Sequence, residues 1–407
     1  MVALAGVLLL VSGAAGCART RDGAADAAAS TTTPASTTTN STSTTSTTTT
    51  TTTTTTAPPT TTTTTLPGPK TMTLAFAGDL LPHLPLVDVA ARYGRGHGDR
   101  YDFDPMLAPM RPIIESADLA ICHMETPVAP DQDHLSGYPA FGAPVELVDA
   151  AKRAGYDGCS TASNHSLDQG RAGIAATLDR FDQDGLRHAG TARTPAEGAA
   201  ITMYDVGGAK VAHLSYAYGF NGYSIPRDAP FAVDQIDVER IHRDATAARQ
   251  AGAALVVVSL HWGTEYQHVP DGFQRSVADR LLPWPDIDVV IGHHAHVVQP
   301  IEHVKGTLVV FGLGNQLANQ PQVPKSDGLT VVLHADQQPN GRYRVTGIEA
   351  VPTWIEPGSF RVLPIVRTLA DPATSPALRG ELGASYDRTA AVLDVAHHPG
   401  ITLAPRP

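Results

Sequence analysis

The sequence predicts an α/β fold with a central sheet, and two observations support this prediction. Short apolar runs that read as buried strands recur along the chain: TMTLAFAGD (71–79), ADLAICHMET (117–126), YDGCSTASNH (156–165), ALVVVSLHWG (254–263), DVVIGHHAH (288–296) and TLVVFGLGN (307–315). The segments between them have helical periodicity, and VELVDAAKRAG places Val145, Val148 and Ala151 on one face. Two further helices are expected at 237–251 and 272–282. Strands that alternate with helices in this way are typical of an α/β domain.

Each predicted strand runs into a polar residue that could bind a ligand. In chain order these residues are Asp79, Glu125, Asn164 with His165, His261, His294 with His296, and Asn315. In open α/β sheets the carboxyl ends of the strands form the crevice in which sites are built. We therefore expect these side chains to converge on one site.

The residue types in this set indicate metal chemistry. Two carboxylates, amide oxygens and several imidazoles suit borderline divalent metals such as Mn, Fe or Zn, and no thiolate is offered. More than four donors are available, which is too many for one tetrahedral ion. The number fits two divalent ions about 4 Å apart that share a water molecule and polarise it into a nucleophile.

Residues 1–16 are predicted to be a signal peptide, because MVALAGVLLLVSGAAGC is an apolar run that ends in small residues and Cys17. A membrane-spanning helix needs about 20 apolar residues, and this run is shorter. GAAGC is similar to a bacterial lipobox, although Ala14 replaces the usual leucine and no basic residue precedes the run. Lipidation of Cys17 would anchor the chain to the extracytoplasmic side of the cell membrane. A cleaved signal with an unmodified cysteine is the alternative, and it also places the folded part outside the cytoplasm.

Residues 17–69 are expected to be a lipid-anchored N-terminus followed by a disordered stalk. Between Thr31 and Thr65, 25 of 35 positions are threonine, so this stretch has almost nothing to bury. The formal net charge of −11 and the lack of a basic stripe argue against a nucleic-acid partner.

Two cysteines remain, Cys122 and Cys159, and both lie in apolar runs. They could pair in an oxidising compartment, but we expect two buried free thiols. Neither has the spacing of a zinc site.

Several motifs resemble those of the CapA family, which is named for poly-γ-glutamate capsule synthesis. They are FAGD, the Met-Glu pair at 124–125, SNHSLDQG, SLHWGTEYQHVPDGFQ, VVIGHHAHVVQPIE and GLGN, and they lie in the order seen in that family. The resemblance covers residues 72 to 365. That family in turn resembles calcineurin-like metallophosphoesterases, which implies a four-layer α/β/β/α sandwich over residues 70–370. The hairpin expected around the PNG turn at 339–341 would complete the second of its two sheets.

The resemblance also implies a role for each matched residue. Asp79 and His296 would bind the first metal, and Glu125 would bridge both ions. The second metal would be held by Asn164, His261 and His294. His165 would be catalytic rather than a ligand, either as a proton donor to the leaving group or as a stabiliser of transition-state charge. Asp168 is expected to cap the helix that follows.

Departures from the family pattern leave four further residues to consider. Phosphoesterases carry Asp-x-His on the first strand, whereas Leu81 lies two residues after Asp79 here; His83 could supply the missing imidazole. His123 stands where the family usually has asparagine, and it is either an extra ligand or a ring beside the site. His293 is expected to be a neighbour of the ligands, and Glu265 to orient a ligating imidazole.

The resemblance implies a metal-dependent hydrolase that acts on a phosphoester or a γ-glutamyl amide, with an anionic polymer or phosphoester as substrate. A non-catalytic envelope protein that uses the same fold for polymer assembly or tethering is the alternative. Residues 371–407 contain one amphipathic stretch, so we expect a helical tail that packs on the domain.

Overall fold

A computed structural model of the chain describes residues 70–320, 322–398 and 400–407. The signal peptide, Cys17 and the Thr-rich stalk lie outside the described residues, so these predictions remain open. Among the residues that the structure describes, no helix is long and apolar enough to cross a membrane.

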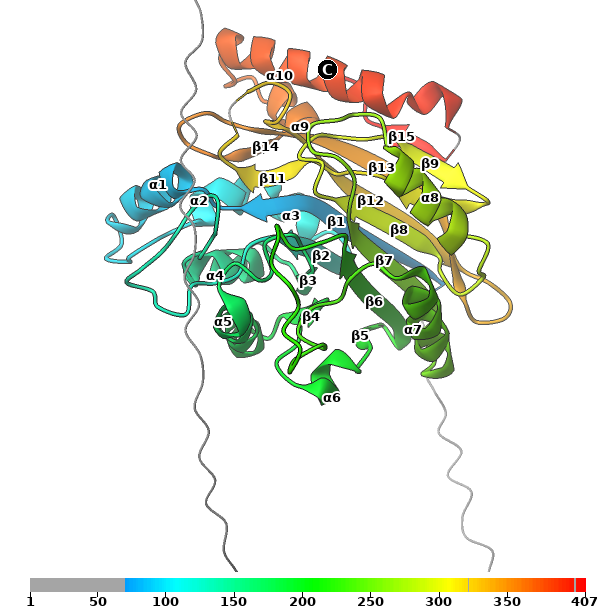
Figure 1. The fold of residues 1–407 in the computed structure, drawn as a ribbon. Coiled ribbons are helices and arrows are strands. Elements are labelled where there is room, and N and C mark those ends of the chain that lie inside the picture. Colours follow the sequence, from blue (N-terminus) through cyan, green and yellow to red (C-terminus); the bar gives the residue numbers. More distant parts are fainter. Residues whose placement is uncertain (1–69, 321, 399) are drawn as a thin grey trace, which may run out of the picture. The chain divides into compact units, whose positions relative to one another are not determined.

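The strands form two sheets, each with parallel and antiparallel neighbours (Figure 1). The large sheet has the order β14 (Val362–Pro364), β13 (Tyr343–Ile355), β12 (Asp327–Gln337), β1 (Thr71–Leu81), β2 (Leu119–Met124), β3 (Gly158–Ser160), β4 (Arg187–Ala189), with β11 (Asn315–Ala318) on β1 and β15 (Ile401–Leu403) on β13. The small sheet has the order β5 (Thr202–Val206), β6 (Ala209–Ala217), β7 (Leu255–His261), β8 (Val289–His293), β10 (Thr307–Val310), β9 (Ile301–Val304). Strands β1 to β4 run parallel, as do β6, β7, β8 and β10, so each sheet gathers its carboxyl ends at one edge.

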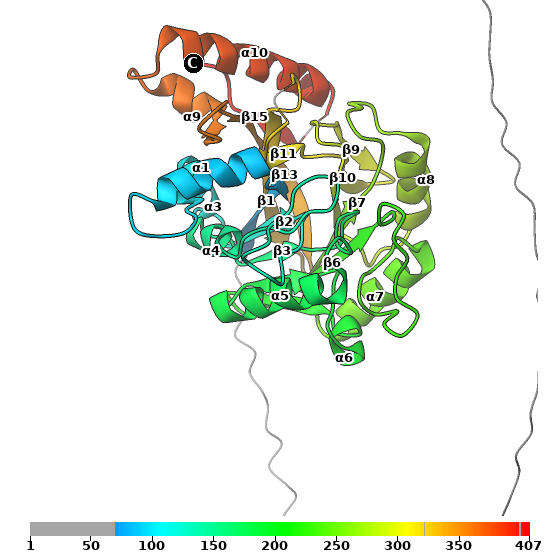
Figure 2. The ribbon, with the colours of Figure 1, turned by 60° about the vertical axis from the view of Figure 1, so that its left-hand side comes forward.

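Helices cover the outer faces of both sheets (Figure 2). Beside the large sheet lie α1 (Leu84–Gly94), α2 (Asp104–Leu107), η1 (Ala108–Met110), α3 (Arg111–Ile114), α4 (Glu146–Arg153) and α5 (Gly170–Asp184), and beside the small sheet lie α7 (Val238–Gln250) and α8 (Gly272–Leu281). The short α6 (Pro195–Gly198) precedes β5, and α9 (Ile365–Ala370), α10 (Pro376–Leu393) and η2 (Val395–His397) follow β14.

Three buried clusters show how these elements are layered. The first joins helix residues such as Leu86 and Phe181 to the large sheet. The second fills the space between the sheets, where Phe76 of β1 and Val257 of β7 are fully or almost fully buried. The third joins the small sheet to helix residues such as Ile241. The result is helix, sheet, sheet, helix, which confirms the predicted α/β/β/α sandwich.

The predicted hairpin around residues 339–341 is present, because β12 and β13 pair antiparallel. It does not complete a separate second sheet as expected. Strand β12 pairs with β1, so the hairpin extends the large sheet, and the small sheet begins only at β5.

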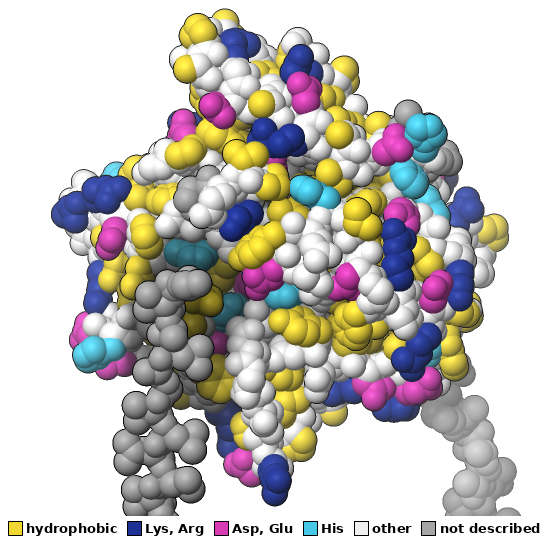
Figure 3. All heavy atoms as spheres, turned by 45° about the horizontal axis from the view of Figure 1, so that its top comes forward, with side chains coloured by type: hydrophobic (Ala, Val, Ile, Leu, Met, Phe, Trp, Pro, Cys, Tyr) yellow, Lys and Arg dark blue, Asp and Glu magenta, His cyan; other side chains and the backbone are white. Residues whose placement is uncertain are grey.

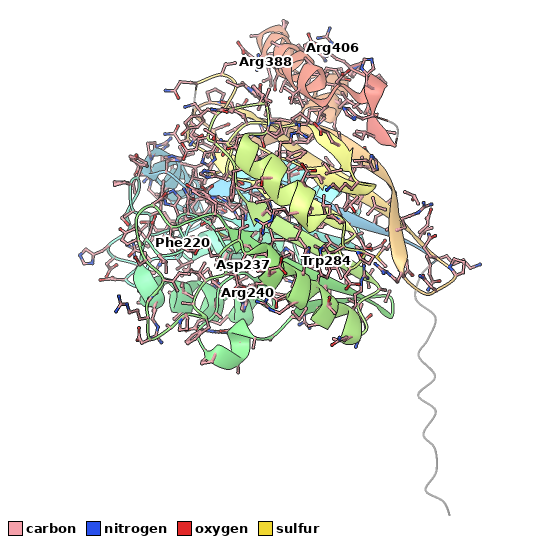
Figure 4. All side chains as sticks on the ribbon, turned by 45° about the vertical axis from the view of Figure 1, so that its right-hand side comes forward. Phe220, Asp237, Arg240, Trp284, Arg388 and Arg406 are labelled. Atoms are coloured by element: carbon pink, nitrogen blue, oxygen red, sulfur yellow. A yellow bond between two sulfur atoms is a disulfide. The ribbon has the colours of Figure 1, made fainter. Side chains whose placement is uncertain are left out.

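The C-terminal segment folds against the hairpin. Helix α10 begins at the N-cap Ser375, whose side chain accepts a hydrogen bond from the Leu378 amide. Arg388 of α10 donates from Nε and Nη2 to the buried carboxylate of Asp327 at 2.6 and 2.8 Å. Figure 4 labels Arg388 on this helix and Arg406 near the end of the chain. The expected helical tail therefore packs on the domain, and a partly buried ion pair joins the two.

The expectation of two free thiols is wrong. Cys122 of β2 and Cys159 of β3 are directly opposite each other in the parallel pair, with Cα atoms 4.4 Å apart, and they form a disulfide. The apolar runs predicted burial correctly, but the register that places the two residues side by side cannot be read from them.

Candidate metal centre

The carboxyl ends of β1, β2, β3, β7 and β8 and the turns that follow them bring the predicted ligands together. The set is Asp79, Glu125, Asn164, His261, His294 and His296, and no member is more than 3% exposed. Four overlapping groups of histidine and carboxylate atoms are placed closely enough to hold a metal ion. The convergence predicted from the strand ends is therefore present.

One group contains Asp79, Glu125 and His296. Nδ1 of His296 lies 3.2 Å from Oδ2 of Asp79, and its Nε2 lies 3.6 Å from Oε1 of Glu125. This is the set that the resemblance implies for the first metal. The structure brings it together without His83.

A second group contains Glu125, His261 and His294. Nε2 of His261 lies 2.9 Å from Oδ1 of Asn164 and 3.9 Å from Oε1 of Glu125. Glu125 belongs to both groups, so its carboxylate lies where a bridging ligand between two ions would be. This is the partition that the resemblance implies for the second metal.

The donor atoms have the properties expected of metal ligands. Both carboxylate oxygens of Glu125, Oδ1 of Asp79, and Nδ1 of His293 and of His294 are buried without a hydrogen-bond partner. A buried polar atom without a partner is costly, by about 1–3 kcal/mol or more for a charged group. Their concentration in one place, with oxygen and imidazole donors only, fits divalent ions such as Mn, Fe or Zn.

Burial and mutual contacts shift the pKa values of these groups in different directions. Burial raises the pKa of Asp79, but the neighbouring imidazoles of His293 and His296 outweigh it and lower the pKa well below its usual value. Burial raises the pKa of Glu125 well above normal. Burial lowers the pKa of His294 to about 3. Burial also opposes charge on His296, but Glu125 and Asp79 raise its pKa to about 9. A metal ion would therefore displace a proton from this cluster when it binds.

Two features of the local backbone place the proposed ligands: a close approach of β1 to a neighbouring loop, and strained φ angles after β8. A Cβ at Gly78 would lie 2.1 Å from the carbonyl oxygen of Gly314, so only glycine allows β1 to approach this loop just before Asp79. After β8, His294 and His296 adopt positive φ angles of 89° and 53°, which are unfavourable for residues other than glycine. Such strain is characteristic of functional sites, where the surrounding structure over-determines the conformation.

His165 lies beside the two groups and is held by Asp168. Nδ1 of His165 and Oδ2 of Asp168 are 2.6 Å apart, and the same oxygen accepts the Phe141 amide at 2.7 Å. The expectation that Asp168 caps a helix is wrong, because α5 has Gln169 at its N-cap and no side-chain cap. Asp168 instead turns inward and fixes the ring of His165. A spacing of three residues was the only signal of this contact in the sequence.

The four additional candidates have different positions. His83 contacts the Leu81 carbonyl oxygen at 3.0 Å and belongs to none of the metal-binding groups. His293 forms a group with Asp79 and His123, and its Nδ1 lies 3.3 Å from Oδ1 of Asp79. Glu265 forms a group with His294 and His296. His83 lies outside these groups but near them, since it lines one cavity with His165 and His296, so its role as a replacement for the missing imidazole on the first strand stays a prediction.

A cavity of about 680 Å³ opens onto the centre. Its lining includes His165, Asn164, His296 and Glu265, together with aromatic and amide side chains that we did not single out from the sequence: Tyr138, Phe141, Tyr223, Tyr266, Asn221 and Gln320. No arginine or lysine is among its described lining residues. Basic and acidic side chains are interspersed over the face shown in Figure 3, without one block of either sign.

Comparison with known proteins gives a family match and related sequences. A family model described as "Bacterial capsule synthesis protein PGA_cap" matches residues 73–320, which is more than half of the chain. The PGA biosynthesis protein CapA of Bacillus subtilis is 27% identical over 305 residues, which are 73% of this chain and 77% of that protein. The capsule biosynthesis protein CapA of Bacillus anthracis is 26% identical over 302 residues, which are 71% and 68% of the two chains.

Solved structures with a similar chain path have low sequence identity. The calcineurin-like phosphoesterase YfkN of Bacillus subtilis has 14% identity and a TM-score of 0.41, with 78% of this chain and 97% of that chain covered. A 5'-nucleotidase precursor of Thermus thermophilus has 14% identity and a TM-score of 0.43, with 79% and 59% covered. The match of the family model over residues 73–320 shows that this chain belongs to the PGA_cap family of bacterial capsule synthesis proteins.

Proposed function

We propose that the protein is a surface-anchored, metal-dependent hydrolase of CapA type, acting on a phosphoester or a γ-glutamyl amide in the synthesis of poly-γ-glutamate or another envelope polymer. The observation that carries this proposal is the position of Glu125, which belongs to two ligand groups at once. The names of the Bacillus relatives, which refer to capsule and PGA biosynthesis, support the link to a polymer.

Each proposed ligand would have a definite role in holding the two ions. Asp79 and His296 would hold one ion, Asn164, His261 and His294 the other, and Glu125 would bind both. Two ions bound in this way would supply an activated water and would stabilise negative charge that develops on the substrate. The chain's own side chains would orient that substrate in the cavity and donate a proton to the leaving group.

His165 is placed for the proton step. It lines the cavity, and its Nδ1 is engaged by Asp168, so its Nε2 is the ring nitrogen available to a substrate. With Asp168 holding the ring, Nε2 would donate a proton to the leaving oxygen or nitrogen as the bond to it breaks. Phe141 restricts the ring further, because its side chain meets the imidazole edge-on at 4.8 Å between centroids.

A non-catalytic role in polymer assembly is the alternative, but it gives no reason for a buried dyad beside a metal site. The deciding experiment is a screen of the Mn-loaded domain, residues 70–407, against phosphomonoesters, phosphodiesters and γ-glutamyl oligopeptides. Wild-type turnover that falls roughly 10²- to 10⁴-fold in His165→Ala, with metal content unchanged, supports the hydrolase. Metal binding without turnover of any substrate class supports the assembly role.

Anchoring belongs to the same proposal. We infer that Cys17 is lipidated and that the Thr-rich stalk carries the domain away from the extracytoplasmic face of the membrane. The small residues before Cys17 support this inference. Cys17→Ala should release the protein into the medium, and membrane retention of that variant would contradict the anchor.

A further inference from the structure

His123 is fully buried on β2 and lies between the two sheets, beside the proposed metal centre. Its Nε2 is 2.9 Å from Nδ1 of His261, and its Nδ1 is 2.7 Å from Oγ of Ser160. Both ring nitrogens are therefore engaged by protein atoms. His123 joins a proposed ligand on the small sheet to a hydroxyl on the large sheet.

The hydrogen bonds along this path have one consistent direction. His261 faces Asn164 and Glu125 with Nε2, so binding of an ion through that nitrogen leaves its proton on Nδ1. Nδ1–H of His261 then donates to Nε2 of His123, and Nδ1–H of His123 donates to Oγ of Ser160. The hydroxyl of Ser160 donates in turn to the carbonyl oxygen of Cys122, 3.4 Å away.

The ring of His123 is also fixed by its surroundings. His293 stacks on it with centroids 4.0 Å apart and an interplanar angle of 15°. Strand pairing places His123 opposite Ser160, and the disulfide between Cys122 and Cys159 joins the same two strands one residue earlier. The acceptor that His123 presents to His261 is therefore held in place on the large sheet.

We infer that His123 is a positioning residue rather than a metal ligand: it fixes the tautomer and orientation of His261 and thereby strengthens binding of the ion held by Asn164, His261 and His294. This inference rests on the metal centre of the proposed function. His123 also forms a possible metal-binding group with Asp79 and His293. The inference nevertheless decides between the two roles left open by the sequence, because a nitrogen that accepts from His261 has no lone pair left for an ion. Partners of this kind change metal affinity by about 10- to 100-fold when they are removed.

The test compares two substitutions at one position. His123→Leu removes the acceptor, whereas His123→Gln keeps an oxygen that can accept from His261 and an amide that can donate to Ser160. Dissociation constants for both Mn²⁺ ions are measured by competition with a chelator of known affinity. We expect His123→Leu to weaken one of the two ions by roughly 10- to 100-fold and His123→Gln to restore most of that loss. Ser160→Ala should produce a smaller weakening of the same ion.

A matched control is His213, another fully buried histidine between the sheets, which bonds Ser259 at 2.9 Å and belongs to no metal-binding group. His213→Leu and His213→Gln should leave both Mn²⁺ affinities near wild type. In the Zn-loaded wild-type domain with ¹⁵N-labelled histidine, the NMR spectrum should show the His123 proton on Nδ1. This measurement requires no variant, so it tests the inference even if His123→Leu does not fold.

Three results would overturn the inference: wild-type affinity in His123→Leu, equal losses in the Gln and Leu variants, or a His123 proton on Nε2. Equal losses would identify His123 as a ligand, because an amide replaces a hydrogen-bond acceptor better than it replaces an imidazole ligand. A wild-type domain that binds neither Mn nor Zn would overturn the metal centre as well. Absence of hydrolysis with normal metal affinity would contradict the proposed function alone.

Discussion

Divalent metal ions should stabilise the folded domain strongly, and this prediction needs no knowledge of the substrate. The perturbation is the addition of Mn²⁺ or Zn²⁺ to the metal-free domain, residues 70–407. In the absence of ions, Glu125 and Asp79 are buried with carboxylate oxygens that lack partners. An ion that binds the folded chain but not the unfolded chain adds RT ln(1 + [M]/Kd) to the free energy of unfolding.

The structure offers two ligand groups that share Glu125, so the expected effect is that of two sites. At a free ion concentration of a hundred times Kd, each site contributes about 2.7 kcal/mol, and two sites contribute roughly 5 kcal/mol. For a domain of this size, 1 kcal/mol shifts the melting temperature by about 2 °C, so the expected rise is roughly 10 °C. Removing the ions with a chelator should reverse it.

Scanning calorimetry of the untagged domain measures this shift, and single substitutions assign it to the two groups. In Asn164→Ala and in His296→Ala, the metal-induced rise in melting temperature should be about half of the wild-type rise. The reason is that each substitution removes a ligand of one proposed ion only. His303→Ala controls for adventitious binding, since this exposed histidine belongs to no metal-binding group.

The stabilisation of the domain by metal ions should also depend on pH. The pKa of His296 is raised to about 9 in the metal-free cluster, so below pH 9 an ion must displace a proton from this ring. The affinity of the ion bound by His296 should therefore rise by up to about tenfold per unit between pH 7 and pH 9. Two results would refute the reasoning. One is a melting temperature that neither Mn²⁺ nor Zn²⁺ changes at millimolar concentration. The other is a full rise in melting temperature in both Asn164→Ala and His296→Ala.

Three further predictions concern residues outside the two ligand groups. Asp168→Asn should lower turnover by roughly 10²-fold or more at unchanged metal content, because His165 loses the carboxylate that holds it; unchanged turnover would contradict the dyad. Arg388→Ala should cost about 3 kcal/mol in urea unfolding by removing the cation paired with the buried Asp327 carboxylate, which keeps the Ser385 hydroxyl as its side-chain donor, whereas Arg406→Ala, at an exposed pair, should cost below about 1 kcal/mol. Burial lowers the pKa of His213 to about 3, so the unfolded state binds the extra proton between pH 6.5 and 3. As the pH is lowered through this range, the free energy of unfolding of the wild type should decrease by about 1.4 kcal/mol per pH unit more than that of His213→Gln. Equal decreases in the two proteins would contradict this.

Most of the candidate metal centre could be predicted from the sequence, because parallel strands of one sheet end at one edge. Asp79 and Glu125 end adjacent strands of the large sheet, while His261 and the histidines after β8 end adjacent strands of the small sheet. Apolar runs reveal such strands, and the polar residue after each run marks its end. The ligands that the sequence identified are those that require only this rule.

Contacts that depend on register or on a turn could not be predicted in the same way. Cys122 and Cys159 were recognised as buried, but their pairing follows from the alignment of β2 with β3. Asp168 reaches His165 because the turn between them is tight, with the Asp168 amide donating to the His165 carbonyl oxygen at 3.0 Å. In the sequence, the same spacing fits a helix cap equally well.

His123 shows where the limit lies. Its role depends on how the two sheets face each other, since its partners His261 and Ser160 come from opposite sides of the space between them. Strand patterns contain no information about the offset between packed sheets, so the sequence left both roles of this histidine open. The structure supplies the offset, and with it an acceptor for the ring of His261. In the proposed centre, a histidine in this place is thus compatible with a second ion, because it would support a proposed ligand instead of competing with one.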